Sequence, residues 1–208
     1  RLRPLYSESG MGVESHNLSP EQGQLLVRLA RQTLAEQFEK KIPQKEIDDL
    51  EAALKNPCFQ VAGGIFVTLT INGQLRGCIG SLTSDEPIRT GVHRNVINAA
   101  FHDPRFAPLS AADFEKVKIE VSILSEPQRL KYRDSDDLME KLRPSVDGVI
   151  VRKDCASATF LPQVWDQLPQ PHEFLGHLCR KAGLAADAWR QTRLEIFTYQ
   201  VQHFSEPT

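Results

Sequence analysis

The segment Leu75–Gly80, Leu-Arg-Gly-Cys-Ile-Gly, combines residue types whose spacing favours chemistry. On an extended strand, Arg76 and Cys78 lie on the same face, about 7 Å apart. A guanidinium at that distance favours the thiolate, which is the nucleophilic form of cysteine, over the thiol. Gly77 and Gly80 carry no side chains, which permits close approach of a ligand or another backbone. The segment therefore predicts a site in which Cys78 is a thiolate activated by Arg76.

A packing role for the same segment stays open. If Asn72-Gly73 forms a two-residue turn, Cys78 lies opposite Val67 and Arg76 lies opposite Leu69. That face of the hairpin is then half apolar, and Cys78 could be a small buried hydrophobe.

Three further charged residues could complete a reactive site. Asp103 and Arg105 follow a predicted helix and could line a crevice at its end, although Asp103-Pro104 could simply end the helix and Arg105 pair with a carboxylate. Glu120 lies on the polar face of a predicted strand, which is ordinarily solvated. If that face lines a crevice, Glu120 is the nearest general base or partner for Arg76. The candidate catalytic residues are Cys78, Arg76 and Glu120, and the candidate ligand-binding residues are Gly77, Gly80, Asp103 and Arg105.

Other motifs point away from metals and cofactors. His172 and His177 resemble a zinc-protease motif, but their spacing of five places the imidazoles about 140° apart around a helix instead of on one face. We expect one of the two to be exposed and the other to be packed against neighbouring helix side chains. The sequence contains neither a Gly-rich phosphate loop nor a Gly-x-Ser-x-Gly elbow. No metal and no cofactor are expected.

The elements that must position these residues are helices interspersed with hairpins. Ser19-Pro20-Glu21-Gln22 reads as a capping box that begins a helix. Val61–Ile71 and Gln74–Gly80 predict a hairpin, Pro87–Phe101 predicts a helix, and Val117–Leu124 alternates as a strand. Further helices are expected near 47–54, 135–142 and 171–181, and further strands at 149–152, 156–161 and 192–203. This order favours an α+β fold with a mostly antiparallel sheet and flanking helices.

Composition excludes several classes of protein. The chain has 208 residues, a net charge of −2 and 40% hydrophobic residues, which argues against nucleic-acid binding by bulk electrostatics. No run of 18 apolar residues predicts a membrane span, and residues 1–10 have no apolar core of a signal peptide. The four cysteines are widely spaced without a C-x-x-C motif, which is typical of a reduced, cytoplasmic chain.

Taken together, these segments make the chain resemble the AMMECR-type domain family, known in bacteria and archaea as AmmeMemoRadiSam system protein A. The resemblance covers roughly residues 20–206, and its Leu75–Gly80 string is highly specific. The motifs that carry it, in chain order, are Phe66-Val67-Thr68-Leu69, Leu75–Leu82, Ala99-Ala100-Phe101, Asp103-Pro104-Arg105-Phe106, Ile119-Glu120-Val121-Ser122, Ala158–Trp165 and Lys181-Ala182-Gly183-Leu184.

The resemblance implies a compact α+β fold in two unequal lobes, with a crevice near Leu75–Gly80. We expect a flexible tail at residues 1–18 and the domain at 19–206, with about 125–165 in the smaller lobe. The resemblance also implies two partners, a Memo-type protein and a radical S-adenosylmethionine enzyme, but no established reaction. Two functions stay open: a Cys78-dependent enzyme or enzyme component, and a non-catalytic binding or adaptor module for either partner.

Overall fold

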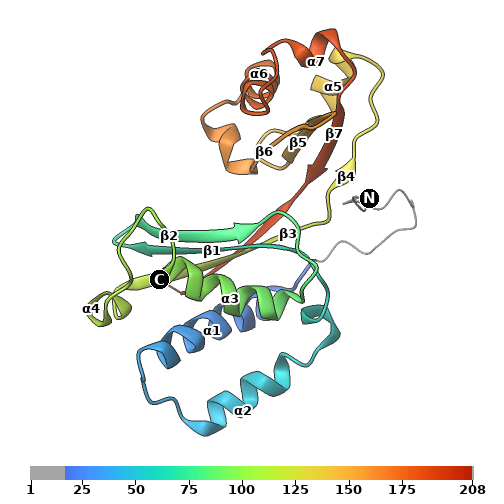
Figure 1. Cartoon of the computed structure of the whole chain (residues 1–208). Coiled ribbons are helices and arrows are strands. Elements are labelled where there is room, and N and C mark those ends of the chain that lie inside the picture. The colour runs from blue at the N-terminus through green and yellow to red at the C-terminus, as the bar shows by residue number, and fades with distance from the viewer. Residues whose placement is uncertain (1–16, 208) are drawn as a thin grey trace. The chain divides into compact units, whose positions relative to one another are not determined.

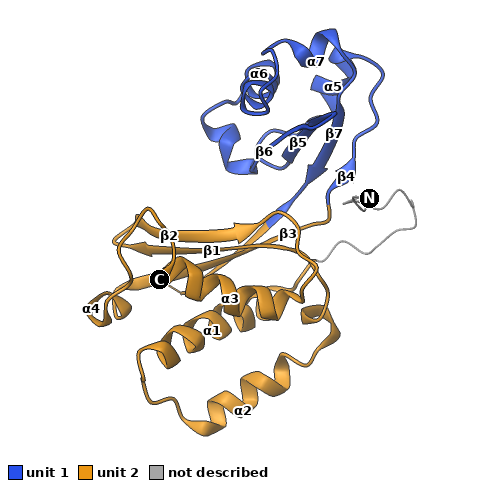
Figure 2. Cartoon of the chain, in the orientation of Figure 1, with its two compact units in different colours: residues 1–13, 127–201 blue, residues 14–126, 202–208 orange. Residues whose placement is uncertain are grey.

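The computed structural model describes residues 17–207, which form two compact units (Figure 2). The larger unit comprises residues 17–126 and 202–207, and the smaller unit comprises residues 127–201. Most of the predicted tail, residues 1–16, lies outside the described part. Leu18, also assigned to that tail, is 5% exposed, and the Gln202 side chain bonds both its backbone N–H and its carbonyl. The packed part of the chain therefore includes Leu18.

The larger unit is built on a sheet with the strand order β2-β1-β3-β8. Its strands are β1 (Gly64–Ile71), β2 (Gln74–Ser81), β3 (Val117–Leu124) and β8 (Val201–Ser205), and β1 is antiparallel to both β2 and β3. Helices α1 (Pro20–Gln37) and α3 (Ile88–Phe101) cover one face of the sheet (Figure 1). We call the opposite face the outer face. The larger unit also contains α2 (Gln44–Ala53), a short 3₁₀ turn (Pro57–Phe59) and α4 (Ala111–Phe114).

The helix-covered face of this sheet is the core of the larger unit. Alternate residues of β1 and β3 point into it, and Val67, Leu69 and Val121 are fully buried there. Helix α1 begins as predicted, because Ser19 accepts from the backbone of Gln22 while the Gln22 side chain accepts from the backbone N–H of Ser19. The apolar stripes of α1 and α3 thus have a defined place to pack.

The smaller unit has its own sheet and core. Its strand order is β4-β7-β5-β6, from β4 (Gln128–Arg129), β7 (Glu195–Tyr199), β5 (Gly148–Lys153) and β6 (Ala156–Phe160). Helices α5 (Ser135–Lys141), α6 (Pro171–Lys181) and α7 (Ala188–Gln191) and the 3₁₀ segment Pro162–Asp166 complete it. Trp165 stacks on Phe174 with 3.7 Å between ring centroids, and both are buried in a separate apolar cluster.

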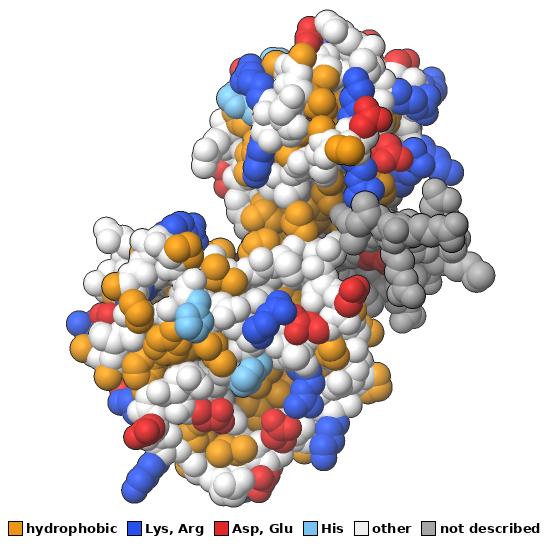
Figure 3. All heavy atoms as spheres, viewed as in Figure 1, with side chains coloured by type: hydrophobic (Ala, Val, Ile, Leu, Met, Phe, Trp, Pro, Cys, Tyr) orange, Lys and Arg blue, Asp and Glu red, His pale blue; other side chains and the backbone are white. Residues whose placement is uncertain are grey.

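The predicted α+β class with antiparallel pairing is confirmed. The single long strand predicted at 192–203 is wrong, because that segment forms β7 in one sheet and β8 in the other. Within residues 17–207, no helix is both long and apolar enough to cross a membrane. Acidic and basic side chains are interspersed over the face of the molecule drawn in Figure 3.

The hairpin between β1 and β2 contains a bulge that changes the predicted register. Asn72 and Gly73 both have positive φ, at 50° and 76°, which matches the tight turn expected for this pair. The register then shifts by one residue at Arg76, so that Thr70 faces Leu75 and Leu69 faces Gly77.

The bulge places Cys78 opposite Thr68, so the prediction that it faces Val67 is wrong. Val67 points into the core, whereas Thr68 belongs to the outer face. A shift of one residue exchanges the two faces of a strand, so the bulge moves Cys78 from the core face to the outer face.

A substitution at Gly77 tests how closely α3 packs on β2. A Cβ at this position would lie 2.1 Å from the carbonyl oxygen of Ala99, which is helix backbone and cannot turn aside. We expect Gly77→Ala to lower the free energy of unfolding by about 2–3 kcal/mol, measured by denaturant titration. Gly63→Ala is the matched control, because its Cβ would have no neighbour closer than 3.7 Å. Equal effects of the two substitutions would contradict this account.

Candidate functional site

Polar side chains from all four strands meet on the outer face of the larger sheet. Thr68 on β1 pairs with Cys78 on β2 and with Glu120 on β3, so these three residues lie side by side. His203 and Ser205 on β8 reach Glu120. We call these five residues the outer-face row.

Two sets of hydrogen bonds join members of the outer-face row, one at each end of the row. The Thr68 hydroxyl donates to Cys78 Sγ at 3.3 Å. Glu120 Oε1 lies 3.3 Å from His203 Nδ1, and the Ser205 hydroxyl donates to Glu120 Oε2 at 3.2 Å. Because a carboxylate only accepts, Nδ1 carries the proton in its contact with Glu120. The row thus brings a thiol, hydroxyls, a carboxylate and an imidazole together on one surface.

The electrostatics of Glu120 keep it ionised. The hydrogen bond from His203 lowers the pKa of Glu120 most, partial burial opposes this, and the Ser205 hydroxyl contributes further lowering. His203 Nδ1 also lies 3.1 Å from the Ser122 hydroxyl, which helps to hold the imidazole in place. Glu120 and His203 therefore form an ordered carboxylate–imidazole pair that can accept or donate a proton.

A hollow of about 340 Å³ adjoins the outer-face row. Thr68, Glu120 and Ser205 belong both to the row and to the lining of the hollow. The remaining lining residues are Thr70, Lys118, Ile119 and Glu206. The volume suits a small molecule.

Asp103 and Arg105 hold the backbone of Cys78 from the open edge of the sheet. The Cys78 N–H donates to Asp103 Oδ2 at 2.9 Å, and Arg105 Nη2 donates to the Cys78 carbonyl at 3.0 Å. Strand β2 is an edge strand, so without these side chains both backbone groups would lack a partner in the ladder. We call this arrangement the edge clamp.

The edge clamp is an ion pair between the exposed Arg105 and the buried Asp103. Arg105 donates to Asp103 through Nε at 2.9 Å and Nη2 at 2.7 Å, and the Asp103 side chain is only 1% exposed. These bonds from Arg105 are the main reason that the pKa of Asp103 lies well below its usual range, against the opposing effect of burial. The same pairing raises the pKa of Arg105.

Arg76 does not occupy the position that the sequence predicts. At the bulge, its Nη2 donates to the Pro108 carbonyl at 3.1 Å and lies 3.9 Å from Asp113. Among the described contacts, Arg76 makes none with Cys78 or Glu120, and its Nη1 is buried without a partner. The guanidinium that bonds the Cys78 backbone belongs to Arg105, and Glu120 bonds His203 and Ser205 of β8.

Gly77 and Gly80 lack side chains at points where another part of the backbone lies very close. A Cβ on Gly80 would lie 2.1 Å from the Ile65 carbonyl oxygen, much as one on Gly77 would meet Ala99. Close approach of a backbone, one of the two predicted possibilities, is therefore what these positions require.

The two histidines of α6 differ from the expectation. Both His172 and His177 are exposed, so the prediction that one is packed is wrong. Among residues 17–207, no group of three or more metal-ligating side chains is close enough to hold an ion.

Sequence reasoning missed Thr68, His203 and Ser205. The available signal was the segment 201–205, in which Phe204 alone is buried while its polar neighbours alternate onto the other face. Predicting one long strand over 192–203 concealed this second pattern.

Comparison with known proteins decides the relationship. Residues 27–204 match the AMMECR1 family. The chain belongs to the AMMECR1 family. An AMMECR1-like protein of Thermofilum pendens is 36% identical over 206 residues, covering 92% of each chain. One from Methanopyrus kandleri is 37% identical over 199 residues, covering 91% of this chain and 90% of the relative.

A solved structure shares the fold of this chain. The crystal structure of an uncharacterised protein from Pyrococcus horikoshii matches with a TM-score of 0.71 and 30% sequence identity. The match covers 91% of this chain and 93% of the Pyrococcus chain. Family membership thus establishes the fold, and a reaction has to be argued from the site.

Substituting Asp103→Asn tests the edge clamp. The amide keeps the shape but faces the Arg105 guanidinium without a charge, so the charge-assisted bonds weaken. We expect the free energy of unfolding at pH 7 to fall by about 2 kcal/mol. Asp154→Asn is the control, because Asp154 is exposed at a positive φ of 52° that asparagine tolerates. A control that loses as much stability as the clamp variant would contradict the assignment.

The same variant changes how stability depends on pH. Folding lowers the pKa of Asp103 below its ordinary value of about 4. The stability that ionised Asp103 contributes is therefore complete above about pH 4 and is lost as the pH falls toward the pKa of the folded state. We expect wild-type stability to decrease more steeply than that of Asp103→Asn between about pH 5 and pH 2. Denaturant titrations at several pH values measure the two slopes, and identical slopes would contradict the expectation.

Proposed function

We propose that this AMMECR1 protein is a thiol-dependent enzyme, with Cys78 as the nucleophile and a small polar substrate in the hollow beside the outer-face row. The observation that carries the proposal is the position of Thr68. Its hydroxyl contacts Cys78 Sγ and its side chain also lines the hollow, which Glu120 lines from the next strand. Glu120 of the proton-transfer pair therefore lines a substrate-sized space, and Cys78 adjoins that space through its contact with Thr68.

Each residue has a defined role in this proposal. The edge clamp fixes the backbone of Cys78, and Thr68 orients its sulfur. Glu120 lies two strands from Cys78, about 10 Å between Cα atoms, so the Glu120–His203 pair acts on the substrate and not directly on the sulfur. Arg76 holds the bulge to Pro108 and is a positioning residue.

The simplest cycle balances with these groups alone. The Cys78 thiolate forms a bond to an electrophilic carbon as the bond to the leaving group breaks, and the Glu120–His203 pair gives the leaving group a proton. Water then attacks the carbon, and its hydroxyl group replaces the sulfur. This step restores the Cys78 thiolate and returns a proton to the Glu120–His203 pair.

The alternative proposal is a binding or adaptor module, with a Memo-type protein or a radical S-adenosylmethionine enzyme as its partner. The observation that favours it is Leu75, which is 44% exposed on the edge strand β2. An exposed apolar side chain at the end of an edge strand suits protein–protein contact. Four free cysteines fit a reducing, cytoplasmic setting for either function.

Alkylation by iodoacetamide, followed by peptide mass spectrometry, tests the enzyme proposal. Cys155 is exposed, Cys78 is half-buried, and Cys179 is fully buried with a pKa raised by burial. We expect native Cys78 to react faster than Cys155 despite its lower exposure, and Cys179 to react only on unfolding. A rate for Cys78 below that of Cys155 would overturn the proposal.

A pair of variants tests the role assigned to Thr68. Removing the hydroxyl that contacts the sulfur should slow alkylation of Cys78 in Thr68→Val about fivefold, the value expected for one hydrogen bond. Thr70→Val is the control, because Thr70 lines the same hollow two residues along the strand. Equal slowing in both variants would contradict a specific role for Thr68.

The adaptor proposal is tested by mixing the chain with a purified Memo-type protein and a purified radical S-adenosylmethionine enzyme from the same organism. Under this proposal, size-exclusion chromatography shows a complex that Leu75→Glu abolishes and Cys78→Ser retains. The absence of any complex with the wild-type chain would exclude it.

A further inference from the structure

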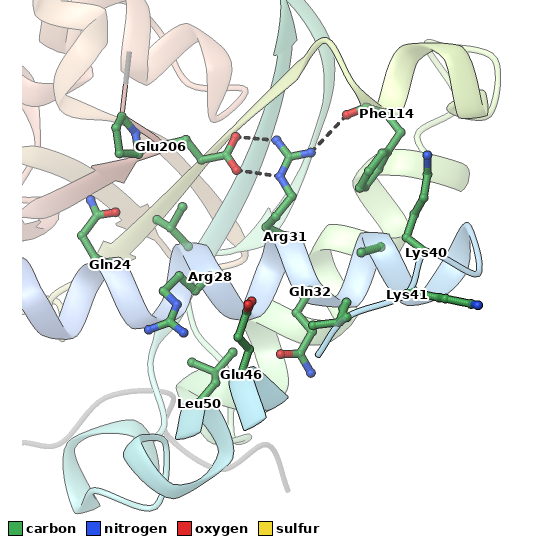
Figure 4. A pocket seen from close by; sticks show the side chains of 14 residues that line it. Gln24, Arg28, Arg31, Gln32, Lys40, Lys41, Glu46, Leu50, Phe114 and Glu206 are labelled. Carbon is green, nitrogen blue, oxygen red and sulfur yellow. Dashed lines mark hydrogen bonds and ion pairs between the residues drawn. The ribbon is translucent and has the colours of Figure 1, made fainter. Parts of the chain in front are cut away.

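A second hollow, of about 360 Å³, lies on the larger unit where α1 and α2 face each other (Figure 4). We call it the α1–α2 pocket. Most of its lining differs from that of the hollow beside the outer-face row, although Glu206 borders both. Its apolar lining consists of Val27, Ala35, Ile42, Leu50, Phe114 and Pro207.

The charged groups of the α1–α2 pocket are predominantly basic. Four cations line it against two carboxylates, and the carboxylates are Glu46 and Glu206. The four cations are Arg28, Arg31, Lys40 and Lys41. The excess of positive charge favours an anionic ligand.

Two of these cations are already used by the fold. Arg31 donates to both carboxylate oxygens of Glu206 and to the carbonyls of Phe114 and Val117. Lys40 Nζ bonds Glu115 at 2.7 Å. These contacts build one wall of the pocket and leave the remaining cations to face a ligand.

Arg28 and Lys41 are the cations still available. Both are exposed, and neither has a hydrogen-bond or ion-pair partner in the part of the chain that the structure describes. Figure 4 shows Arg28 at the same end of the pocket as Glu46 and Leu50, whereas Lys41 extends toward the other end. Arg28 is therefore the better placed of the two to bind an anion above the apolar lining.

We propose that the α1–α2 pocket binds a small organic carboxylate with an apolar body. The apolar body packs against the apolar lining, in which Ile42 is partly exposed, and the carboxylate pairs with the planar fork of Arg28. A neutral ligand leaves the basic groups unmatched, and an organic cation is repelled by them. The volume suits a small molecule and is too small for a protein segment of standard interface size.

Glu46 makes the proposal unusually easy to test. Its carboxylate lines the pocket without a described partner of its own, so it repels the bound anion. Neutralising Glu46 must therefore strengthen binding, whereas neutralising Arg28 must weaken it. Opposite effects from two neighbouring exposed residues are not expected of a general change in stability.

The experiment is isothermal titration calorimetry of the full chain with 4-phenylbutyrate and with the uncharged 4-phenylbutan-1-ol. We expect the carboxylate to bind more tightly than the alcohol. Arg28→Gln should weaken carboxylate binding about threefold and Glu46→Gln should strengthen it about threefold, while alcohol binding stays unchanged. Lys45→Gln is the matched control, because Lys45 is exposed on α2 outside the pocket lining.

Three outcomes would overturn the proposal: no binding at millimolar carboxylate, equal affinity for carboxylate and alcohol, or equal weakening in Arg28→Gln and Lys45→Gln. None of these outcomes bears on Cys78, whose alkylation rate reports on the other site.

Discussion

One extra residue in β2 decides which face of the sheet carries Cys78. The hairpin turn at Asn72-Gly73 sets a register that would direct Cys78 into the core beside Val67. The bulge at Arg76 moves every later residue of β2 by one position, so Cys78 joins Thr68 on the outer face and Gly77 turns toward α3. The thiol site and the close contact with α3 thus both follow from this single irregularity.

The bulge and the strand edge are held by the same segment of chain. Residues 102–113, which follow α3, bond the backbone of Cys78 through Asp103 and Arg105 and receive the Arg76 side chain at Pro108. An edge strand with a bulge would otherwise expose several unpaired backbone groups. The charged residues that look catalytic in the sequence therefore also satisfy the backbone, which explains why Asp103 is almost fully buried.

The C-terminal strand completes both the sheet and the site. Strand β8 follows the smaller unit in sequence but pairs beside β3, where it brings His203 and Ser205 to Glu120. Immediately after it, Glu206 pairs with Arg31 of α1 and accepts from the backbone of Ile119. These bonds fasten this segment to residues more than 80 positions earlier, and the pairing of β8 with β3 gives the carboxylate of Glu120 its imidazole.

The sequence by itself determined the features that depend on neighbours a few residues apart. The capping box at Ser19, the turn at Asn72-Gly73 and the alternation of β3 are local patterns, and each appears in the structure as predicted. They were sufficient for the α+β class, and the Leu75–Gly80 string pointed to the region of the site.

Only the tertiary structure decided which residues meet there. The bulge at Arg76, the clamp from Asp103 and the arrival of His203 beside Glu120 depend on pairings between distant segments. A one-residue change in register exchanges the two faces of a strand, and no local pattern reveals it. The sequence therefore identified Cys78 and Glu120 as candidates, whereas the fold replaced Arg76 with Thr68, Arg105 and His203 as their neighbours.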